Sequence, residues 1–323
     1  MQYYVYVKDL VGVRTNAKNF RWSFGSGASA VTEREYETCK VKIELTVVKD
    51  KQVPRSEQQG NFRFFYAPCN TGMLYYYRKV LGLFPLSFAV SIRENTIYAT
   101  VGRTYYDRVR VKVMNIHPIW YILFDLTTVL LLQNGYLPMY AASFAYDDRG
   151  ALLMGPPNMG KTITALRLAK NERIRLLGED IAVTDGEKIY PVPLTNTYRR
   201  YSDADSDVRK IAFSGECAAI SALYLLERGS SGVQHTDRSD EKVSLLHRYG
   251  IGWHSSPAVA TLSYYNDAFS MKALLAKEEA ILRQVLLRAS VCTVKDEDAS
   301  GYAALITDAL QQEKNENIIA LQH

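Results

Sequence analysis

The chain has 323 residues, of which 47% are hydrophobic and 23% charged, and its formal net charge is +5. This composition predicts a soluble globular protein with enough residues for a large core and two domains. The mild positive charge weighs against nucleic-acid binding, which needs a concentrated basic face.

Neither a secretion signal nor a membrane span is predicted. Met1–Leu10 contains Lys8 and Asp9, and the most apolar segment, Ile119–Leu132, is short for a bilayer and carries Asp125. Widely spaced cysteines give no zinc-binding pair and no disulfide framework, so free thiols in a reducing cytoplasm are expected. These are Cys39, Cys69, Cys217 and Cys292.

Residues 1–115 are expected to form a β-rich N-terminal domain. Lys40–Val48 alternates polar and apolar residues, as a half-buried strand does. Glu94 and Asn95 are predicted to form a hairpin turn. Further strands are expected at Phe62–Tyr66, Ser87–Ile92, Thr96–Val101 and Val109–Val113. The region carries no chemical motif, so a lid, a substrate-docking surface and an oligomer interface all remain open for it.

Residues 116–323 are expected to form a second domain. A helix should begin near His117-Pro118 and end at Asn134-Gly135, where Gly suits the C-terminus. Leu137–Phe144 is predicted as one strand. The short apolar run Ala151–Met154 predicts another strand, and Thr162–Lys170 has the spacing of a helix.

The loop between that strand and that helix is the strongest motif in the chain. It matches GxxxxGK[ST], the phosphate-binding P-loop, whose setting is a strand, a glycine-rich loop and a helix. Backbone N–H groups and the helix dipole would hold phosphate, Lys161 would reach the β- and γ-phosphates, and Thr162 would ligate Mg²⁺. The predicted nucleotide-binding residues are Gly155, Pro156, Pro157, Asn158, Met159, Gly160, Lys161 and Thr162.

Two carboxylates follow the next predicted strand, Ile174–Leu177. Glu179 and Asp180 come directly after Gly178, at the end of a strand expected beside the P-loop strand. A carboxylate there commonly orients Mg²⁺. One of the pair is therefore expected to hold the metal and the other to accept the proton of an attacking hydroxyl. An exposed acidic turn is the alternative.

The remaining elements are predicted in order from their patterns. Asp185-Gly186 predicts a two-residue hairpin turn, and Leu194–Ser214 is polar and irregular. A strand is expected at Ala219–Leu226, helices at Asp240–Tyr249 and Ala268–Arg288, a strand at Val291–Val294 and a helix from Gly301.

A few further polar residues have weaker functional interpretations. Arg199 and Arg200 could stabilise a transferring phosphoryl group, but a solvated loop compensated by nearby aspartates is the stronger interpretation. A structural role is favoured for His247 and His254. Nothing else in the sequence predicts a transition-metal site or a Ser-His-Asp triad.

Several of these segments together resemble the catalytic domain of bacterial HPr kinase/phosphorylase and its kinase relatives. That domain has the P-loop, an Ala-Leu pair on the next helix, and an Arg-Leu-(Ile/Val)-Ala-Asp-Asp element. The matching segments here are Tyr140–Ala142, Gly155–Thr162, Ala165-Leu166, Arg175–Asp180, the hairpin Thr184–Tyr190 with Pro191–Pro193, and Leu223–Gly229. The resemblance covers roughly residues 115–310.

The resemblance implies an α/β (α+β) fold related to phosphoenolpyruvate carboxykinase and an ATP-dependent kinase acting on a serine-like hydroxyl. By motif, Lys161 and Thr162 would bind the phosphates and Mg²⁺. Asp180, which is also predicted as a metal ligand, would match the family's second Asp, the base that takes the proton from the substrate hydroxyl. Glu179 would replace the family's first Asp. The acceptor could be a protein, a peptide or a small molecule, and self-association is expected because relatives often form oligomers.

Two departures from the family pattern indicate a divergent member with another substrate. Tyr140 stands where the family usually has a His, and a phenol with a pKa near 10 cannot shuttle protons at neutral pH. This puts a phosphorylase reaction in doubt, and the kinase step to a lesser degree. The family's downstream signature with an Arg-Gly-Leu-Gly core is also missing.

Two other functions stay open beside the kinase. The chain could be a nucleotide-binding regulatory or scaffold protein in which Tyr140 and Glu179 mark weak or lost transfer. A carboxykinase acting on an oxaloacetate-like acid is the weaker choice, because no carboxylate-binding arginine motif accompanies the P-loop.

Overall fold

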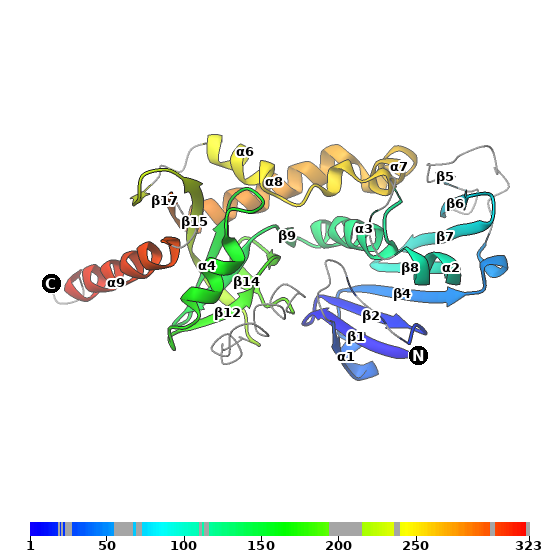
Figure 1. Cartoon of the computed structure of the whole chain (residues 1–323), viewed down its shortest axis with the longest axis horizontal. Coiled ribbons are helices and arrows are strands. Elements are labelled where there is room, and N and C mark those ends of the chain that lie inside the picture. Colours follow the sequence, from blue (N-terminus) through cyan, green and yellow to red (C-terminus); the bar gives the residue numbers. More distant parts are fainter. Residues whose placement is uncertain are drawn as a thin grey trace. The chain divides into compact units, whose positions relative to one another are not determined.

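The chain forms a mixed α/β structure with two mixed β-sheets (Figure 1). The computed structural model describes all residues except 19, 21, 23–27, 55–66, 69–72, 110, 111, 113–115, 194–214, 236–239, 298–300 and 321–323. Contacts divide the chain into two compact units, one of Met1–Gly135 with Gly252–Glu278 and one of Tyr136–Ile251 with Glu279–His323. This grouping differs from the predicted division at residue 115.

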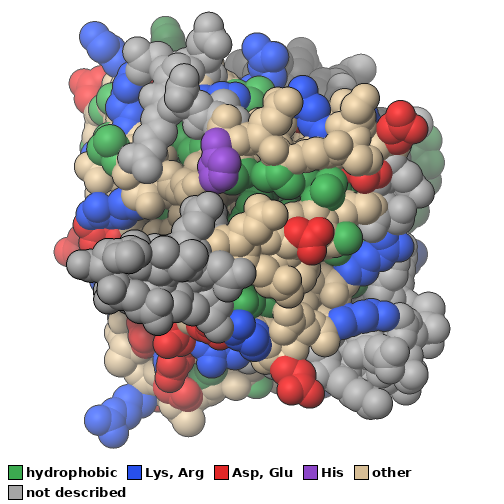
Figure 2. Space-filling view, turned by 90° about the vertical axis from the view of Figure 1, so that its left-hand side faces the viewer, with side chains coloured by type: hydrophobic (Ala, Val, Ile, Leu, Met, Phe, Trp, Pro, Cys, Tyr) green, Lys and Arg blue, Asp and Glu red, His purple; other side chains and the backbone are tan. Residues whose placement is uncertain are grey.

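The surface and the helices give two general findings. On the face seen in Figure 2, the described Lys and Arg side chains are scattered among acidic and uncharged ones. Among the described residues, no helix combines the length and the apolar character that a bilayer crossing requires.

The first unit is built on an eight-stranded sheet in the order β3-β1-β2-β4-β8-β7-β6-β5. β2, β4 and β8 are mutually parallel, and the other neighbours are antiparallel. The strands are β1 (Gln2–Val7), β2 (Val11–Thr15), β3 (Ser29–Ala30), β4 (Val41–Val48), β5 (Ala67–Pro68), β6 (Leu74–Val80), β7 (Phe84–Arg93) and β8 (Thr96–Gly102).

Several helices and short 3₁₀ turns complete the first unit. They are α1 (Glu33–Glu37), α2 (Arg103–Arg108), α3 (Ile119–Gln133), α7 (Pro257–Tyr265), η2 (Asp50–Gln52), η4 (Trp253–Ser255) and η5 (Asp267–Phe269). The helix α8 (Met271–Arg288) passes from the first unit into the second after Glu278. Helix α7 was not predicted, because its apolar residues lack a clear helical spacing.

The sequence patterns of the first unit are largely confirmed. In β4, buried and half-buried residues alternate along the whole strand, as its polar-apolar alternation predicts. Glu94 and Asn95 form the predicted hairpin turn between the paired residues Arg93 and Thr96. The predicted strand Phe62–Tyr66 lies outside the described residues. The predicted strand Val109–Val113 lies partly outside them, and Val109 itself ends helix α2.

Helix α3 carries one acidic residue, Asp125, on an otherwise apolar surface. Its carboxylate accepts a hydrogen bond from Ser256 and lines a cavity of about 470 Å³ together with His117 and Lys112. Burial raises the pKa of Asp125 to about 7, and the Ser256 hydrogen bond opposes part of this rise. Burial and the Lys112 charge lower the pKa of His117.

We expect the stability of the protein to fall between about pH 4 and pH 7 because of Asp125. Its pKa lies near 3.8 in the unfolded chain and near 7 in the folded chain. In that window only the folded state still binds the proton, so stability is full below the lower value and declines as pH rises toward the upper one. The loss should be on the order of 3 kcal/mol.

Urea unfolding of the parent and of Asp125→Asn at pH 5 and pH 8 measures this loss. Between pH 5 and pH 8, the Asn variant should lose about 3 kcal/mol less stability than the parent does. The contribution of His117 cancels in this comparison because both proteins contain it. Equal pH dependence in the two proteins would show that Asp125 ionises normally.

The second unit is built on a nine-stranded sheet whose main order is β12-β10-β11-β15-β14-β13-β9. β17 pairs with β15 and β16, and β11, β15 and β17 are parallel. The strands are β9 (Leu137–Met139), β10 (Ala142–Tyr146), β11 (Arg149–Met154), β12 (Ile174–Gly178), β13 (Ala182–Thr184), β14 (Lys188–Tyr190), β15 (Ala218–Arg228), β16 (Gly232–His235) and β17 (Ser290–Asp296). Its helices are α4 (Lys161–Leu168), α6 (Asp240–Arg248), α9 (Tyr302–Ala320) and the second half of α8.

Two local predictions in this unit were wrong. Leu137–Phe144 is not one strand, because the chain turns at Tyr140 and Ala141, where the Ala141 N–H donates to the carbonyl of Met139 (2.9 Å). β9 then pairs with β13, whereas β10 pairs with β11 and β12. The hairpin at Asp185-Gly186 is also longer than two residues, since the nearest pair is Thr184 with Ile189.

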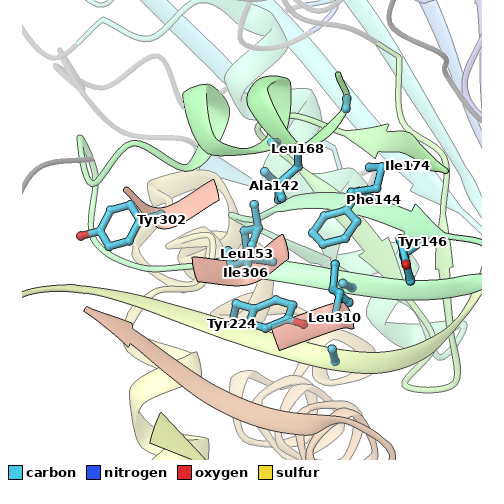
Figure 3. Packing of buried hydrophobic residues seen from close by; sticks show 14 of the residues in the cluster. Ala142, Phe144, Tyr146, Leu153, Leu168, Ile174, Tyr224, Tyr302, Ile306 and Leu310 are labelled. Carbon is cyan, nitrogen blue, oxygen red and sulfur yellow. The ribbon is translucent and has the colours of Figure 1, made fainter. Parts of the chain in front are cut away.

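One face of this sheet is covered by α4 and α9. Figure 3 shows Phe144, Leu153 and Tyr224, from neighbouring strands β10, β11 and β15, packed with Ile306 and Leu310 of α9. The rings of Phe144 and Tyr224 stack with centroids 6.5 Å apart. α4 adds Ala165, Leu166 and Leu168 to the same cluster. This core fixes β11 and α4, the two elements that flank the glycine-rich loop.

Candidate functional site

The predicted P-loop has the expected setting of strand, loop and helix. β11 ends at Met154 and α4 begins at Lys161, with Gly160 as its N-cap. Gly160 has φ +94° and Asn158 has φ +63°, so both lie in the left-handed region. Gly accepts this conformation without steric cost and Asn tolerates it better than most residues. The predicted helix Thr162–Lys170 is thereby confirmed, with bounds shifted by one or two residues.

Gly155 also has a positive φ, of +156°, and in addition it is closely packed. A Cβ atom at this position would lie 2.9 Å from the carbonyl oxygen of Leu226 on β15. The loop therefore runs directly against the end of the neighbouring strand. A larger residue would push the loop away from the edge of the sheet.

We expect Gly155→Ala to destabilise the protein by about 1–3 kcal/mol, because the added methyl overpacks this contact. Gly232→Ala, where an added Cβ meets nothing within 4 Å, is the matched control and should change stability by less than about 0.5 kcal/mol. Urea denaturation measures both. Equal small effects would mean that the loop has room to move away from β15.

Lys161 folds back over the loop that precedes it. Its ammonium donates to the carbonyl oxygens of Gly155 (2.9 Å) and Pro156 (3.0 Å), and its side chain is buried, with 5% of the residue exposed. The same nitrogen lies 4.1 Å from the centre of the Tyr140 ring. Burial lowers the pKa of Lys161 to about 8, and the charge of Asp180 opposes that shift.

The two predicted carboxylates lie beside this lysine and Thr162. The Thr162 hydroxyl donates to the backbone carbonyl of Glu179 (3.3 Å), which ties the start of α4 to the end of β12. Glu179 itself is buried, with 1% exposed, whereas Asp180 is only partly buried. Of the two side chains, Asp180 is therefore the one open to a substrate.

The position of β12, the strand that precedes the two carboxylates, differs from the prediction. β12 is not adjacent to β11, because β10 lies between them. β10 is antiparallel to both, so β11 and β12 run in the same direction and end at the same edge of the sheet. The two-residue turn at Asp147 and Asp148 folds β10 back onto β11, so that β10 lies between β11 and β12.

The electrostatics of Asp180 and Tyr140 are coupled to Lys161. Burial raises the pKa of the Asp180 carboxyl, and the Lys161 charge opposes the rise. Burial, with a smaller effect from the charge of Asp180, raises the pKa of the Tyr140 phenol. The site thus holds a lysine that loses its proton more easily than usual, beside a carboxylate that holds its proton more strongly.

One supporting residue was missed in the sequence analysis. Tyr302, on α9, donates its hydroxyl to the carbonyl of Glu227 at the end of β15 (2.7 Å) and contacts the sulfur of Met159 in the loop (3.4 Å). It packs a distant helix against the P-loop. Nothing local in the sequence around Tyr302 indicates this contact, which depends on how α9 crosses the sheet.

The remaining candidates from the sequence are two arginines and two histidines. Arg199 and Arg200 lie outside the described residues. His247 is near the C-terminal end of α6 in the second unit. His254 lies in η4, which belongs to the first unit, whereas the P-loop belongs to the second.

The residues present fit a magnesium ion that is only partly held by protein. Within the described ranges, no three His, Cys, Asp or Glu side chains come together as a metal site. Mg²⁺ characteristically takes one or two protein ligands and completes its shell with phosphates and water. Thr162 and Asp180 supply oxygen donors of that kind beside the P-loop.

Comparison of the sequence with protein-family models and with curated proteins gave no match. The interpretation of the site therefore rests on its residues and their arrangement.

Proposed function

We propose that the protein is an ATP- and Mg²⁺-dependent kinase that transfers the γ-phosphoryl group to a serine-like hydroxyl. The observation that carries this proposal is the convergence of the P-loop, Lys161, Thr162 and Asp180 at one edge of the second sheet. A phosphate-binding loop alone would support nucleotide binding. The partly exposed Asp180 beside the loop lysine adds a group that can take a proton.

In this mechanism, the loop N–H groups and the Lys161 ammonium bind the triphosphate. Lys161 exchanges the carbonyl oxygens of Gly155 and Pro156 for phosphate oxygens, which are stronger, charged acceptors. When Mg²⁺ is bound, held on the protein side by Thr162 and Asp180, it neutralises phosphate charge.

The chemical step is an in-line displacement at the γ-phosphorus. The acceptor oxygen forms the new P–O bond, the bond from the γ-phosphorus to the bridging oxygen of ADP breaks, and the hydroxyl proton passes to Asp180. The raised pKa of Asp180 suits this role, because a base is most effective when its pKa approaches the working pH.

The resemblance to HPr kinase/phosphorylase relatives supports this assignment and the proposal of a phosphoenolpyruvate-carboxykinase-like fold for the second unit. It also supports a protein, peptide or small alcohol as acceptor and self-association of the chain. Tyr140 at the position of the family's His favours a kinase without a phosphorylase reaction.

A second candidate is a nucleotide-binding regulatory or scaffold protein. The observation in its favour is the burial of Glu179, since one of the two carboxylates predicted to act has 1% of its surface exposed. In that case ATP would bind at the P-loop and no acceptor would be phosphorylated.

Mass spectrometry distinguishes the two functions. The purified protein would be incubated with Mg²⁺-ATP and an extract of its own organism, beside Lys161→Ala and Asp180→Asn. A phosphoryl group on a serine-bearing product, formed only by the parent protein, supports the kinase. Tight ATP binding without transfer to any component of the extract supports the regulatory protein.

A further inference from the structure

The aromatic ring of Tyr140 lies against the charged end of Lys161. The lysine nitrogen is 4.1 Å from the ring centre, which is within the range of a cation–π contact. The ring reaches this position because the chain leaves the sheet between β9 and β10, where Ala141 bonds back to Met139. A continuous strand would have carried Tyr140 along the sheet instead.

The contact matters because Lys161 is buried without a direct hydrogen bond to a carboxylate among the described residues. Its ammonium has two carbonyl acceptors, the Tyr140 ring and the more distant charge of Asp180. Burying an ammonium is costly unless its surroundings replace the lost water. The negative face of an aromatic ring replaces part of that hydration.

We propose that Tyr140 is a positioning residue whose ring, not its hydroxyl, holds the Lys161 ammonium aimed at the phosphate-binding loop. The proposal rests on the proposed nucleotide binding of that loop. It adds a defined role for a side chain that the P-loop motif does not include.

The chemistry of a ring suits this role better than that of a carboxylate. A carboxylate at position 140 would form a charge-assisted pair with Lys161, and an arriving phosphate would have to break that pair. An aromatic face attracts the ammonium more weakly than a carboxylate does. Lys161 is therefore kept in place and still released to the nucleotide.

Equilibrium binding of Mg²⁺-ATP to Tyr140→Phe and Tyr140→Leu tests the proposal. The Phe variant should bind within about twofold of the parent, and the Leu variant about tenfold more weakly, because only Leu removes the ring. Tyr98→Leu is the matched control. It removes a similar contact, between Arg93 and the exposed Tyr98 ring (5.7 Å) in the first unit, and should leave ATP binding unchanged.

A measurement on the unmodified protein keeps the test independent of variant folding. The protons on the Lys161 carbon next to the nitrogen should show an upfield ring-current shift in the nuclear magnetic resonance spectrum, assigned by its loss in Lys161→Ala. A normal lysine shift, or equal ATP affinity in the Leu and Phe variants, would overturn the role of Tyr140. Failure of the parent to bind ATP at all would instead overturn the proposed function, and the ring-current shift would still decide the contact.

Discussion

Asp180→Asn should reduce phosphoryl transfer by about 10²- to 10⁴-fold, the range expected for loss of a general base. The Asn side chain keeps the size of Asp180 but cannot accept the proton of the attacking hydroxyl. ATP affinity should fall much less than the rate, because Lys161 and the loop are intact, and the Mg²⁺ concentration needed should rise because Asp180 also supplies a metal ligand. Initial rates with the acceptor identified by mass spectrometry give the first quantity, and calorimetric titration gives the second.

The control sharpens this prediction. Asp148→Asn alters a carboxylate that is 98% exposed at the β10–β11 turn, and should leave transfer unchanged. Undiminished transfer by Asp180→Asn would rule out Asp180 as the base. A parallel rise in the Mg²⁺ concentration needed would assign it to the metal as well.

Lys161→Ala should reduce transfer by about 10²- to 10³-fold and weaken ATP binding, because one charged phosphate donor is lost. The protein should nevertheless stay folded, since the substitution also removes a buried ammonium whose desolvation is unfavourable. Transfer rates and thermal melting of the same samples measure both effects. Lys170→Ala, just beyond α4, is the control with the same loss of charge.

The contrary outcome for Lys161 is also clear. If Lys161→Ala binds and transfers as well as the parent, the sequence match to GxxxxGK[ST] does not describe a phosphate site. If the variant instead unfolds while Lys170→Ala does not, the main role of the Lys161 contacts with Gly155, Pro156 and Tyr140 is to stabilise the fold.

Patterns confined to one segment were predicted well from the sequence. The alternation in β4, the turn at Glu94-Asn95, the C-terminus of α3 at Asn134-Gly135 and the sequence β11, loop, α4 all depend on neighbouring residues. The residues at the centre of the candidate site also follow from a local pattern, the GxxxxGK[ST] motif. Lys161 and Thr162 are fixed by the motif, and Asp180 lies near them because β12 ends at the same edge.

Features that depend on distant contacts could not be predicted. No local pattern indicates that the chain breaks at Tyr140, that β10 separates β11 from β12, or that Tyr302 contacts the loop through α9. The different burial of Glu179 and Asp180 is also set by tertiary packing, since adjacent residues in the sequence look equivalent. The loop motif therefore predicted the strand, loop and helix and the position of Lys161 and Thr162, and the surrounding packing was needed for the rest.

Calorimetric titration of the purified protein with Mg²⁺-ATP tests the central claim, that the loop from Gly155 to Thr162 binds nucleotide phosphates, most directly. The prediction is saturable binding of one ATP per chain, absent with adenosine and greatly weakened in Lys161→Ala. Absence of heat with every nucleoside triphosphate, or equal binding of ATP and adenosine, would contradict it.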